Sequence, residues 1–283
     1  MITGTTRIYG IYGWPVEHTF SPAMHNAAFR ALDKDARYVP FAVAPEMLEE
    51  AVLAIRALGL CGLNITVPHK ERVIPFLDGL SEEASLIGAV NTIQVKDGKL
   101  IGHNTDGRGF IRSLREDAGF KPRGKSVVLI GSGGAARAVG FSLALAKTSS
   151  IACFDIDAAK AAALCREIAQ KTGVRTSPLV PADVPSAAMN AACLINATPL
   201  GLKKGDPLPL AKSLILKHHL VCDLVYNPPE TPLLKAAKAR GARRLSGIGM
   251  LLYQGVIAFE LWTGGKAPIA VMKRALAGQM RAR

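Results

Sequence analysis

Long apolar runs are missing from this sequence of 283 residues. No stretch approaches the roughly 18 consecutive apolar residues that a membrane span needs. The chain also does not open on a basic segment followed by an apolar run and a small-residue cleavage site. We therefore expect no membrane association and no signal peptide, and the cytoplasm is the expected location.

Cysteine and histidine are scarce, and neither forms a metal-binding pattern. The five cysteines are odd in number, lie mostly in apolar runs and show no C-x-x-C spacing. The six histidines include no H-E-x-x-H motif and no Cys/His cluster. We expect reduced, structural cysteines and no metal.

Aromatic residues make up only 6% of the chain. The net charge of +13 raises the question of nucleic-acid binding. Because Lys and Arg are scattered, the sequence shows neither the basic stripe nor the stacking platform typical of nucleic-acid binding. We expect no nucleic-acid partner. The positive charge favours an anionic small molecule, such as a carboxylate substrate or a dinucleotide, or serves only solubility.

The most informative motif in the sequence is a glycine cluster that begins at Gly131. Residues 127–130 are aliphatic and run directly into Gly131, after which a helical pattern begins. The pattern is G-x-G-x-x-A: Gly131 allows a tight turn, Gly133 lets a pyrophosphate approach the backbone, and Ala136 allows close helix–strand packing. The amino terminus of the helix then faces the phosphates. We expect a bound dinucleotide.

An acid follows the next strand, where a dinucleotide-binding unit places its ribose-binding carboxylate. Residues 150–154 read as a strand, and Asp155 comes directly after it. The alternative is an ordinary buried turn in which Asp155 or Asp157 caps the following helix.

The element pattern predicts an α/β protein of two domains. Residues 1–105 alternate strands and helices, with a strand over 62–67, a short helix after Lys70 and a hairpin turn at Asp97-Gly98, which predicts a mixed sheet. Residues 106–246 continue as a doubly wound, Rossmann-type parallel sheet. Two helices without a strand between them fill residues 247–283 and are expected to return to the first domain.

Two polar groups lie at element ends in the first domain. Thr19 and Ser21 are two residues apart, so both hydroxyls could donate to one carboxylate; the alternative is that Ser21 caps the helix that Pro22 begins. Asn64 and Thr66 share one face of a strand and Lys70 follows that strand, so the three could contact a ligand. The alternative is that Asn64 and Thr66 are ordinary polar residues at a sheet end and that Lys70 is solvated.

Several motifs, met in order along nearly the whole chain, resemble those of the shikimate dehydrogenase family. They are Gly13 with Pro15, Asn64–Lys70, Gly88–Thr92, Asn104–Gly107, Gly131–Ala138, Asn196–Gly201, Asp223–Tyr226 with Thr231–Leu233, and Gly249–Gln254.

The resemblance implies a substrate domain and a dinucleotide domain around a cleft. It also implies reversible hydride transfer between a nicotinamide and a ring hydroxyl of a cyclohexene or cyclohexane carboxylate, within aromatic amino acid biosynthesis. The implied catalytic pair is Lys70 and Asp106. The implied substrate-binding residues are Thr19, Ser21 and Tyr226 for the carboxylate and Asn64, Thr66, Asn91, Asp106 and Gln254 for ring hydroxyls. The implied cofactor-binding residues are Gly131, Ser132, Gly133, Gly134 and Ala135 for the pyrophosphate and Thr198, Leu224, Gly247 and Met250 around the nicotinamide.

Two departures from the family pattern refine these expectations. Where members that use NADP carry an arginine patch, this sequence has Asp155-Ile156-Asp157, so NAD is favoured over NADP. Thr19 stands where biosynthetic members usually have serine, which makes quinate a candidate substrate beside shikimate.

The rival functions are a dehydrogenase of a related, aminoshikimate-like carboxylate and a non-catalytic NAD-binding sensor. A sensor would be expected to lose Lys70 or Asp106, and both are present. Whether the protein forms a homodimer stays open.

Overall fold

The computed structural model describes residues 2–281, and the chain divides into two compact units. One unit consists of Met1–Thr105 together with Gln254–Arg283, and the other of Asp106–Tyr253. The division falls inside helix α9 (Ile248–Thr263), so this helix contributes residues to both units.

The first unit is built on a mixed sheet of six strands in the order β2-β1-β3-β5-β6-β4. Its strands are β1 (Arg7–Gly13), β2 (Ala36–Ala42), β3 (Gly62–Ile65), β4 (Gly79–Leu80), β5 (Thr92–Lys96) and β6 (Lys99–His103). Strand β1 runs parallel to β2 and β3, whereas β5 is antiparallel to both β3 and β6. The last pair is the hairpin that the Asp97-Gly98 turn predicts.

The helices of the first unit, besides the end of α9, differ in how they are capped. They are α1 (Ser21–Ala31), α2 (Leu48–Ala57), α3 (Glu82–Ile87) and α10 (Ile269–Arg281), with short 3-10 helices at Pro45–Met47 and Ile74–Phe76. Helix α3 is capped by Ser81, whose hydroxyl accepts from the Ala84 amide at 3.2 Å, and it ends at Gly88 with φ of 72°. Helix α10 packs against α1. The predicted return of the C-terminal helices to the first domain is confirmed.

Trp262, near the end of α9, fixes that helix to the first unit's sheet. Its indole N–H donates to the Ile93 carbonyl at 2.9 Å. A Cβ atom at Gly62 would lie 2.4 Å from the indole ring, so only glycine lets β3 and this ring approach so closely.

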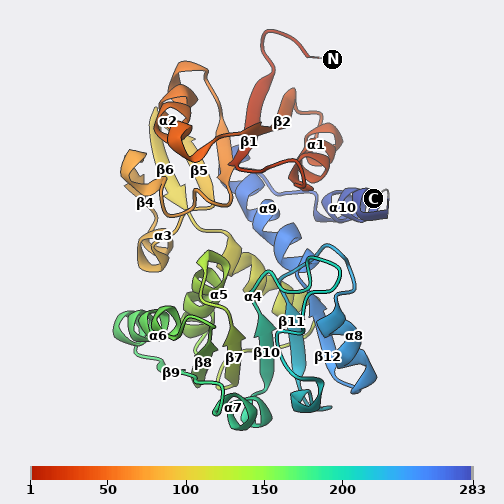
Figure 1. Cartoon of the computed structure of the whole chain (residues 1–283). Helices are drawn as coiled ribbons and strands as arrows, with labels where there is room; N and C mark the ends of the chain where they lie inside the picture. The colour runs from red at the N-terminus through yellow and green to blue at the C-terminus, as the bar shows by residue number, and fades with distance from the viewer. Residues whose placement is uncertain (1, 282–283) are drawn as a thin grey trace. The chain divides into compact units, whose positions relative to one another are not determined.

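The second unit is an all-parallel sheet in the order β12-β11-β10-β7-β8-β9 (Figure 1). Its strands are β7 (Ser126–Ile130), β8 (Ser150–Phe154), β9 (Arg175–Pro178), β10 (Cys193–Asn196), β11 (Leu220–Asp223) and β12 (Arg243–Ser246). Its helices, besides the start of α9, are α4 (Asp106–Glu116), α5 (Gly134–Leu145), α6 (Ala158–Thr172), α7 (Val184–Asn190) and α8 (Pro232–Ala239), with a 3-10 helix at Lys212–Leu214. The chain builds outward from β7 to β9 and then crosses to β10. Ligands bind at such a switch point, beyond the carboxyl ends of β7 and β10. The expected Rossmann-type α/β fold is confirmed.

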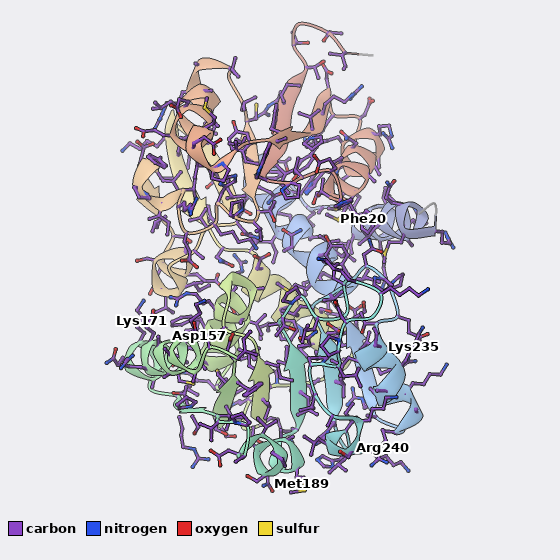
Figure 2. The ribbon with its side chains drawn as sticks, in the orientation of Figure 1. Phe20, Asp157, Lys171, Met189, Lys235 and Arg240 are labelled. Atoms are coloured by element: carbon purple, nitrogen blue, oxygen red, sulfur yellow. The ribbon has the colours of Figure 1, made fainter. Side chains whose placement is uncertain are left out.

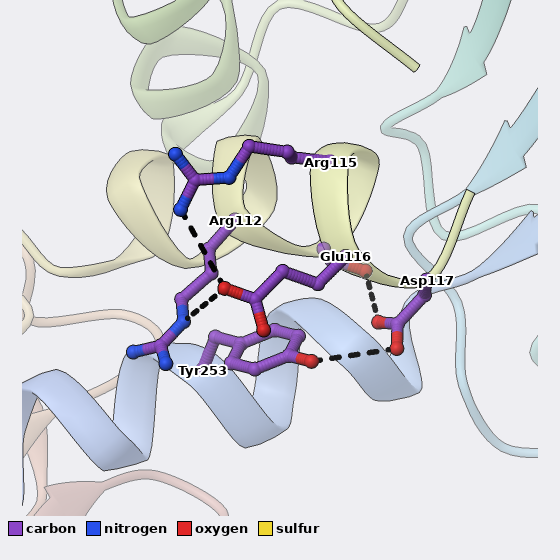
Figure 3. Close-up of polar contacts among 6 residues, drawn as sticks. Arg112, Arg115, Glu116, Asp117 and Tyr253 are labelled. Atoms are coloured by element: carbon purple, nitrogen blue, oxygen red, sulfur yellow. Dashed lines mark hydrogen bonds and ion pairs between the residues drawn. The ribbon is translucent and has the colours of Figure 1, made fainter. Parts of the chain in front are cut away.

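Within the second unit, side-chain contacts join α4 to the start of α9 (Figure 3). The Tyr253 hydroxyl donates to Asp117 Oδ1 at 3.4 Å, and the Arg112 guanidinium lies 5.0 Å from the centre of the Tyr253 ring. Glu116 accepts from Arg112 at 3.0 Å and pairs with Arg115 at 3.5 Å. These contacts hold the first turns of α9 on the second unit.

Two local expectations are corrected. The strand expected over 62–67 ends at Ile65, because Pro68 has no N–H to continue the ladder. The helix expected directly after Lys70 is a set of turns, followed by the 3-10 helix Ile74–Phe76. Within residues 2–281, no helix is long and apolar enough to cross a membrane, and no group of three or more His, Cys, Asp or Glu side chains could hold a metal ion.

Candidate active site

The glycine turn between β7 and α5 leaves room for a phosphate. The N-cap of helix α5 is Gly133, which has no side chain to accept from the first N–H groups of the helix. A Cβ atom at Gly133 or Gly134 would meet nothing within 4 Å. Gly131 has a φ of 103°, which residues other than glycine rarely adopt. The loop fits a pyrophosphate at the helix terminus.

Asp155 is held in place at the end of β8. Its Oδ2 accepts from the Ser132 hydroxyl at 2.6 Å, and its Oδ1 accepts from the Asp157 backbone N–H at 2.9 Å. Partial burial acts to raise the pKa of Asp155, but these hydrogen bonds outweigh it, and the pKa lies below its usual value. The carboxylate is therefore ionised at neutral pH.

The cap of the following helix is Asp157 and not Asp155. Asp157, labelled in Figure 2 at the start of α6, accepts from the Lys160 backbone N–H at 3.3 Å. Asp155 is thus left for another role.

On the other side of the switch point, the structure brings Thr198 close to the glycine turn. A Cβ atom at Gly131 would lie 3.1 Å from the Thr198 methyl. Asn196 Oδ1 accepts from the Thr198 backbone N–H at 3.0 Å and from its hydroxyl at 2.6 Å. These contacts fix the loop that follows β10.

Asp223, at the end of β11, organises the next loop. The carboxylate is buried and accepts from Asn196 Nδ2 at 2.9 Å, the Val225 N–H at 3.1 Å and the Thr231 hydroxyl at 2.6 Å. Burial raises the pKa of Asp223, and these three donors oppose the shift. Asn196 and Asp223 were not among the predicted site residues. The available signal was that each is a polar residue at the end of an apolar strand.

The same loop brings two of the predicted nicotinamide-side residues, Leu224 and Gly247, close together. A Cβ atom at Gly247 would lie 2.3 Å from the Leu224 carbonyl oxygen, so glycine is needed for this approach. Leu224 and Met250 are partly exposed, as is Tyr226.

We expect Thr231→Val to destabilise the protein by about 2–4 kcal/mol, because it removes a hydrogen bond to a buried carboxylate and the cap of α8, which Thr231 supplies to Leu234. The measurement is urea unfolding. Thr148→Val, which removes only a buried bond to the Leu143 carbonyl, is the control and should cost about 1 kcal/mol. Equal losses would show that Asp223 does not depend on Thr231.

In the first unit, Ser21 and Thr19 come together at the start of α1. The Ser21 backbone N–H donates to the Thr19 hydroxyl oxygen at 3.2 Å. The N-cap is Phe20, labelled in Figure 2, and no side chain caps the helix. The alternative that Ser21 is a helix cap is therefore wrong, and its buried hydroxyl instead contacts the Tyr38 hydroxyl.

Asn64 and Asn91 also come together. Asn64 Nδ2 donates to the Asn91 carbonyl at 3.2 Å, and both side chains contact the Thr92 hydroxyl, at 3.0 and 3.1 Å. Asn91 further donates to the Thr105 hydroxyl at 3.0 Å. Thr92 and Thr105 were missed as site residues because each is one position from a residue that the motifs emphasise.

The remaining predicted residues are placed as follows. Thr66 lies just beyond β3. Its methyl group is close to Gly13: a Cβ atom at Gly13 would lie 2.4 Å from it. Lys70 is half-buried, and its carbonyl accepts from the Val90 N–H at 2.8 Å. Gln254 in the first unit and Asp106 in the second are both buried.

A parallel sheet in this order, with a glycine-rich first turn and an acid after its second strand, defines the dinucleotide-binding class. Buried hydroxyl and amide groups in the other unit suit a polyhydroxylated small molecule. Together they indicate an oxidoreductase that uses a dinucleotide.

Comparison with known proteins identifies the family. Residues 11–93 match the shikimate dehydrogenase substrate binding domain, and residues 247–277 match the shikimate 5'-dehydrogenase C-terminal domain. A shikimate dehydrogenase (NADP(+)) of Desulforamulus reducens is 48% identical over 283 residues, which covers 99% of this chain and 97% of that protein.

Two solved structures are similar over almost their full length. A shikimate dehydrogenase in complex with NADP+ is 42% identical, with a TM-score of 0.92 and coverage of 99% of this chain and 98% of the other. Shikimate 5-dehydrogenase from Listeria monocytogenes, in complex with shikimate and NAD, is 36% identical, with a TM-score of 0.91 and coverage of 96% and 97%. The chain belongs to the shikimate dehydrogenase family of nicotinamide-dependent oxidoreductases.

Proposed function

We propose that this protein catalyses reversible, NAD-dependent oxidation of a ring hydroxyl of shikimate, with quinate as a second substrate. The observation that carries the proposal is the buried group of hydroxyl and amide side chains formed by Ser21, Asn64 and Asn91. Such groups discriminate strongly for a ligand whose hydroxyls match them, because an unmatched buried polar group is costly. The relatives named above bind or act on shikimate, which supports the same substrate here.

Lys70 and Asp106 are the proposed catalytic pair. Oxidation of a secondary alcohol releases a proton as the hydride departs, and a bound nicotinamide takes up the hydride. The Lys70 amine would accept that proton, and in the reverse direction its ammonium would return it to the alkoxide. Asp106 would orient Lys70 and the substrate hydroxyl.

NAD is the proposed cofactor, although the Desulforamulus relative is named for NADP(+). The Asp155 carboxylate could accept hydrogen bonds from a ribose diol and would repel a 2′-phosphate. Ile156, where an arginine would be needed to receive that phosphate, is 99% exposed and apolar. The Listeria relative, solved in complex with shikimate and NAD, supports this choice for a similar protein.

The rival dehydrogenase of an aminoshikimate-like carboxylate is kept because of Thr19, whose methyl would narrow the carboxylate pocket. A non-catalytic sensor is disfavoured because Lys70 and Asp106 are both present. One absorbance assay decides among these: reduction of NAD and of NADP, each with shikimate and with quinate. No reduction in any of the four combinations would overturn the proposed function.

Ser21→Ala is expected to raise KM for shikimate by about tenfold to a hundredfold, since a hydrogen bond to a carboxylate contributes about 1.5–3 kcal/mol. Thr19→Ser, the companion variant, keeps the hydroxyl and should preserve binding while shifting the shikimate-to-quinate preference toward shikimate. Steady-state kinetics with both substrates test this. Unchanged substrate ratios in Thr19→Ser would remove the argument from the methyl group.

A further inference from the structure

The Tyr38 side chain connects two strands of the first unit's sheet that are not adjacent. It lies in β2, yet its hydroxyl donates to Asn64 Oδ1 in β3 at 2.7 Å, across the intervening strand β1. The side chain is 1% exposed. Burial raises the pKa of the Tyr38 phenol above its usual value, so the hydroxyl remains a donor at neutral pH.

Two neighbouring residues of α1 hold Tyr38 in this position. The Asn26 side chain donates to the Tyr38 carbonyl and accepts from its N–H, both at 2.8 Å. The His25 ring stacks on the phenol with centroids 4.4 Å apart and planes 11° apart. Complete burial lowers the pKa of His25 to about 3, so this ring stays neutral. The phenol is therefore fixed at both its backbone and its ring.

The hydroxyl of Tyr38 also contacts Ser21. Ser21 and His25 are four residues apart on α1, so they share a face, and Tyr38 lies along that face. Because the phenol hydrogen goes to Asn64, the serine hydroxyl is the donor in its contact with Tyr38. Ser21 has a single hydroxyl hydrogen, so it would have to turn away from Tyr38 to donate to a substrate carboxylate.

Hydrogen bonds continue from Asn64 to Thr92, Asn91 and Thr105. Asn64 Nδ2 donates to the Thr92 hydroxyl at 3.0 Å, Thr92 donates to Asn91 Oδ1 at 3.1 Å, and Asn91 Nδ2 donates to the Thr105 hydroxyl at 3.0 Å. Each member is buried. Tyr38 donates into this network at Asn64 and so favours one orientation of the Asn64 amide.

A consequence for Asn64 follows from counting its donors and acceptors. Both amide hydrogens are used, by the Asn91 carbonyl and by Thr92, and one lone pair of Oδ1 accepts from Tyr38. Only the second lone pair remains, so a ligand hydroxyl can donate to Asn64 but cannot accept from it.

We infer that Tyr38 is a positioning residue of the substrate site, which presents Asn64 to the substrate as an acceptor. The inference rests on the proposed function, because it assumes that Asn64 binds shikimate.

The test is Tyr38→Phe, which keeps the ring stacked on His25 and removes only the hydroxyl. We expect kcat/KM for shikimate to fall by about tenfold to a hundredfold, mainly through KM, with KM for NAD changed less than about twofold. Tyr12→Phe is the matched control: it removes another buried tyrosine hydroxyl of this unit, one that donates to the Ala51 carbonyl at 2.9 Å. It should leave KM for shikimate within about twofold.

A second variant keeps the test informative if Tyr38→Phe does not fold. Thr92→Val conserves shape and breaks the network one step further along, so it should also raise KM for shikimate. In a double-mutant cycle, adding Tyr38→Phe to Asn64→Ala should cost less than Tyr38→Phe does alone. An active wild-type enzyme whose shikimate KM is unchanged in Tyr38→Phe and Thr92→Val overturns the positioning role. An inactive wild-type protein instead overturns the proposed function.

Discussion

Lys70→Ala is expected to lower kcat for shikimate oxidation by about two to four orders of magnitude, the range typical of losing a general base or acid. The physical reason is that no other group is proposed to accept the alcohol proton as the hydride departs. KM should change much less, because the hydroxyl and amide side chains that we propose for binding remain. Steady-state kinetics with NAD and shikimate measure both quantities.

Two further variants separate the chemical role of Lys70 from its charge and bulk. Lys70→Met keeps most of the stem and removes the amine, so it should behave like Lys70→Ala. Lys96→Ala removes an exposed lysine at the end of β5 in the same unit and should leave kcat within about twofold. A Lys70→Ala enzyme with normal kcat and a raised KM would assign the residue to binding alone.

The architecture of the second unit was predictable because its signals are local. An apolar run followed by a glycine turn and a helical pattern identifies β7 and α5, and repetition of that pattern leaves few topologies once parallel crossovers are right-handed. The predicted fold class is confirmed on this ground. The end of β3 was placed too late, because a proline two residues beyond Thr66 interrupts the ladder without altering the apolar pattern.

The polar networks of both units were not predictable in the same way, because their partners are distant in sequence. Tyr38 meets Asn64 only when β2, β1 and β3 are paired in the observed register. Asp223 contacts Asn196 because β10 and β11 are adjacent, and Thr231 because the loop after β11 turns back. Periodicity identifies which face of a strand is buried, but it does not give the register that decides which side chains meet.

The same limit applies to Asp155, whose role the sequence left between ribose binding and helix capping. The distinction depends on which carboxylate reaches the first turn of α6. The structure gives that contact to Asp157, while Asp155 accepts from Ser132 in the glycine turn. Asp155 is therefore the residue that should decide the choice of cofactor.

The wild-type protein is expected to prefer NAD over NADP by between one and three orders of magnitude in kcat/KM. A carboxylate near a 2′-phosphate, at an effective dielectric constant of about 20, gives a repulsion of roughly 2–4 kcal/mol, which corresponds to that range. The pKa of Asp155 lies below its usual value, so the repelling charge is present at neutral pH. The measurement is kcat/KM for both cofactors at saturating shikimate.

Combining Asp155→Asn with Ile156→Arg should reverse the preference, because the first change removes the repulsion and the second supplies a guanidinium that can pair with the phosphate in bidentate fashion. Asp157→Asn is the matched control: it removes one negative charge two residues away and leaves a side chain that can still cap α6, so the NAD preference should persist. Efficient use of NADP by the wild-type protein would show that Asp155 does not bind the ribose. Loss of the preference in Asp157→Asn would instead assign the discrimination to the net charge of the loop after β8.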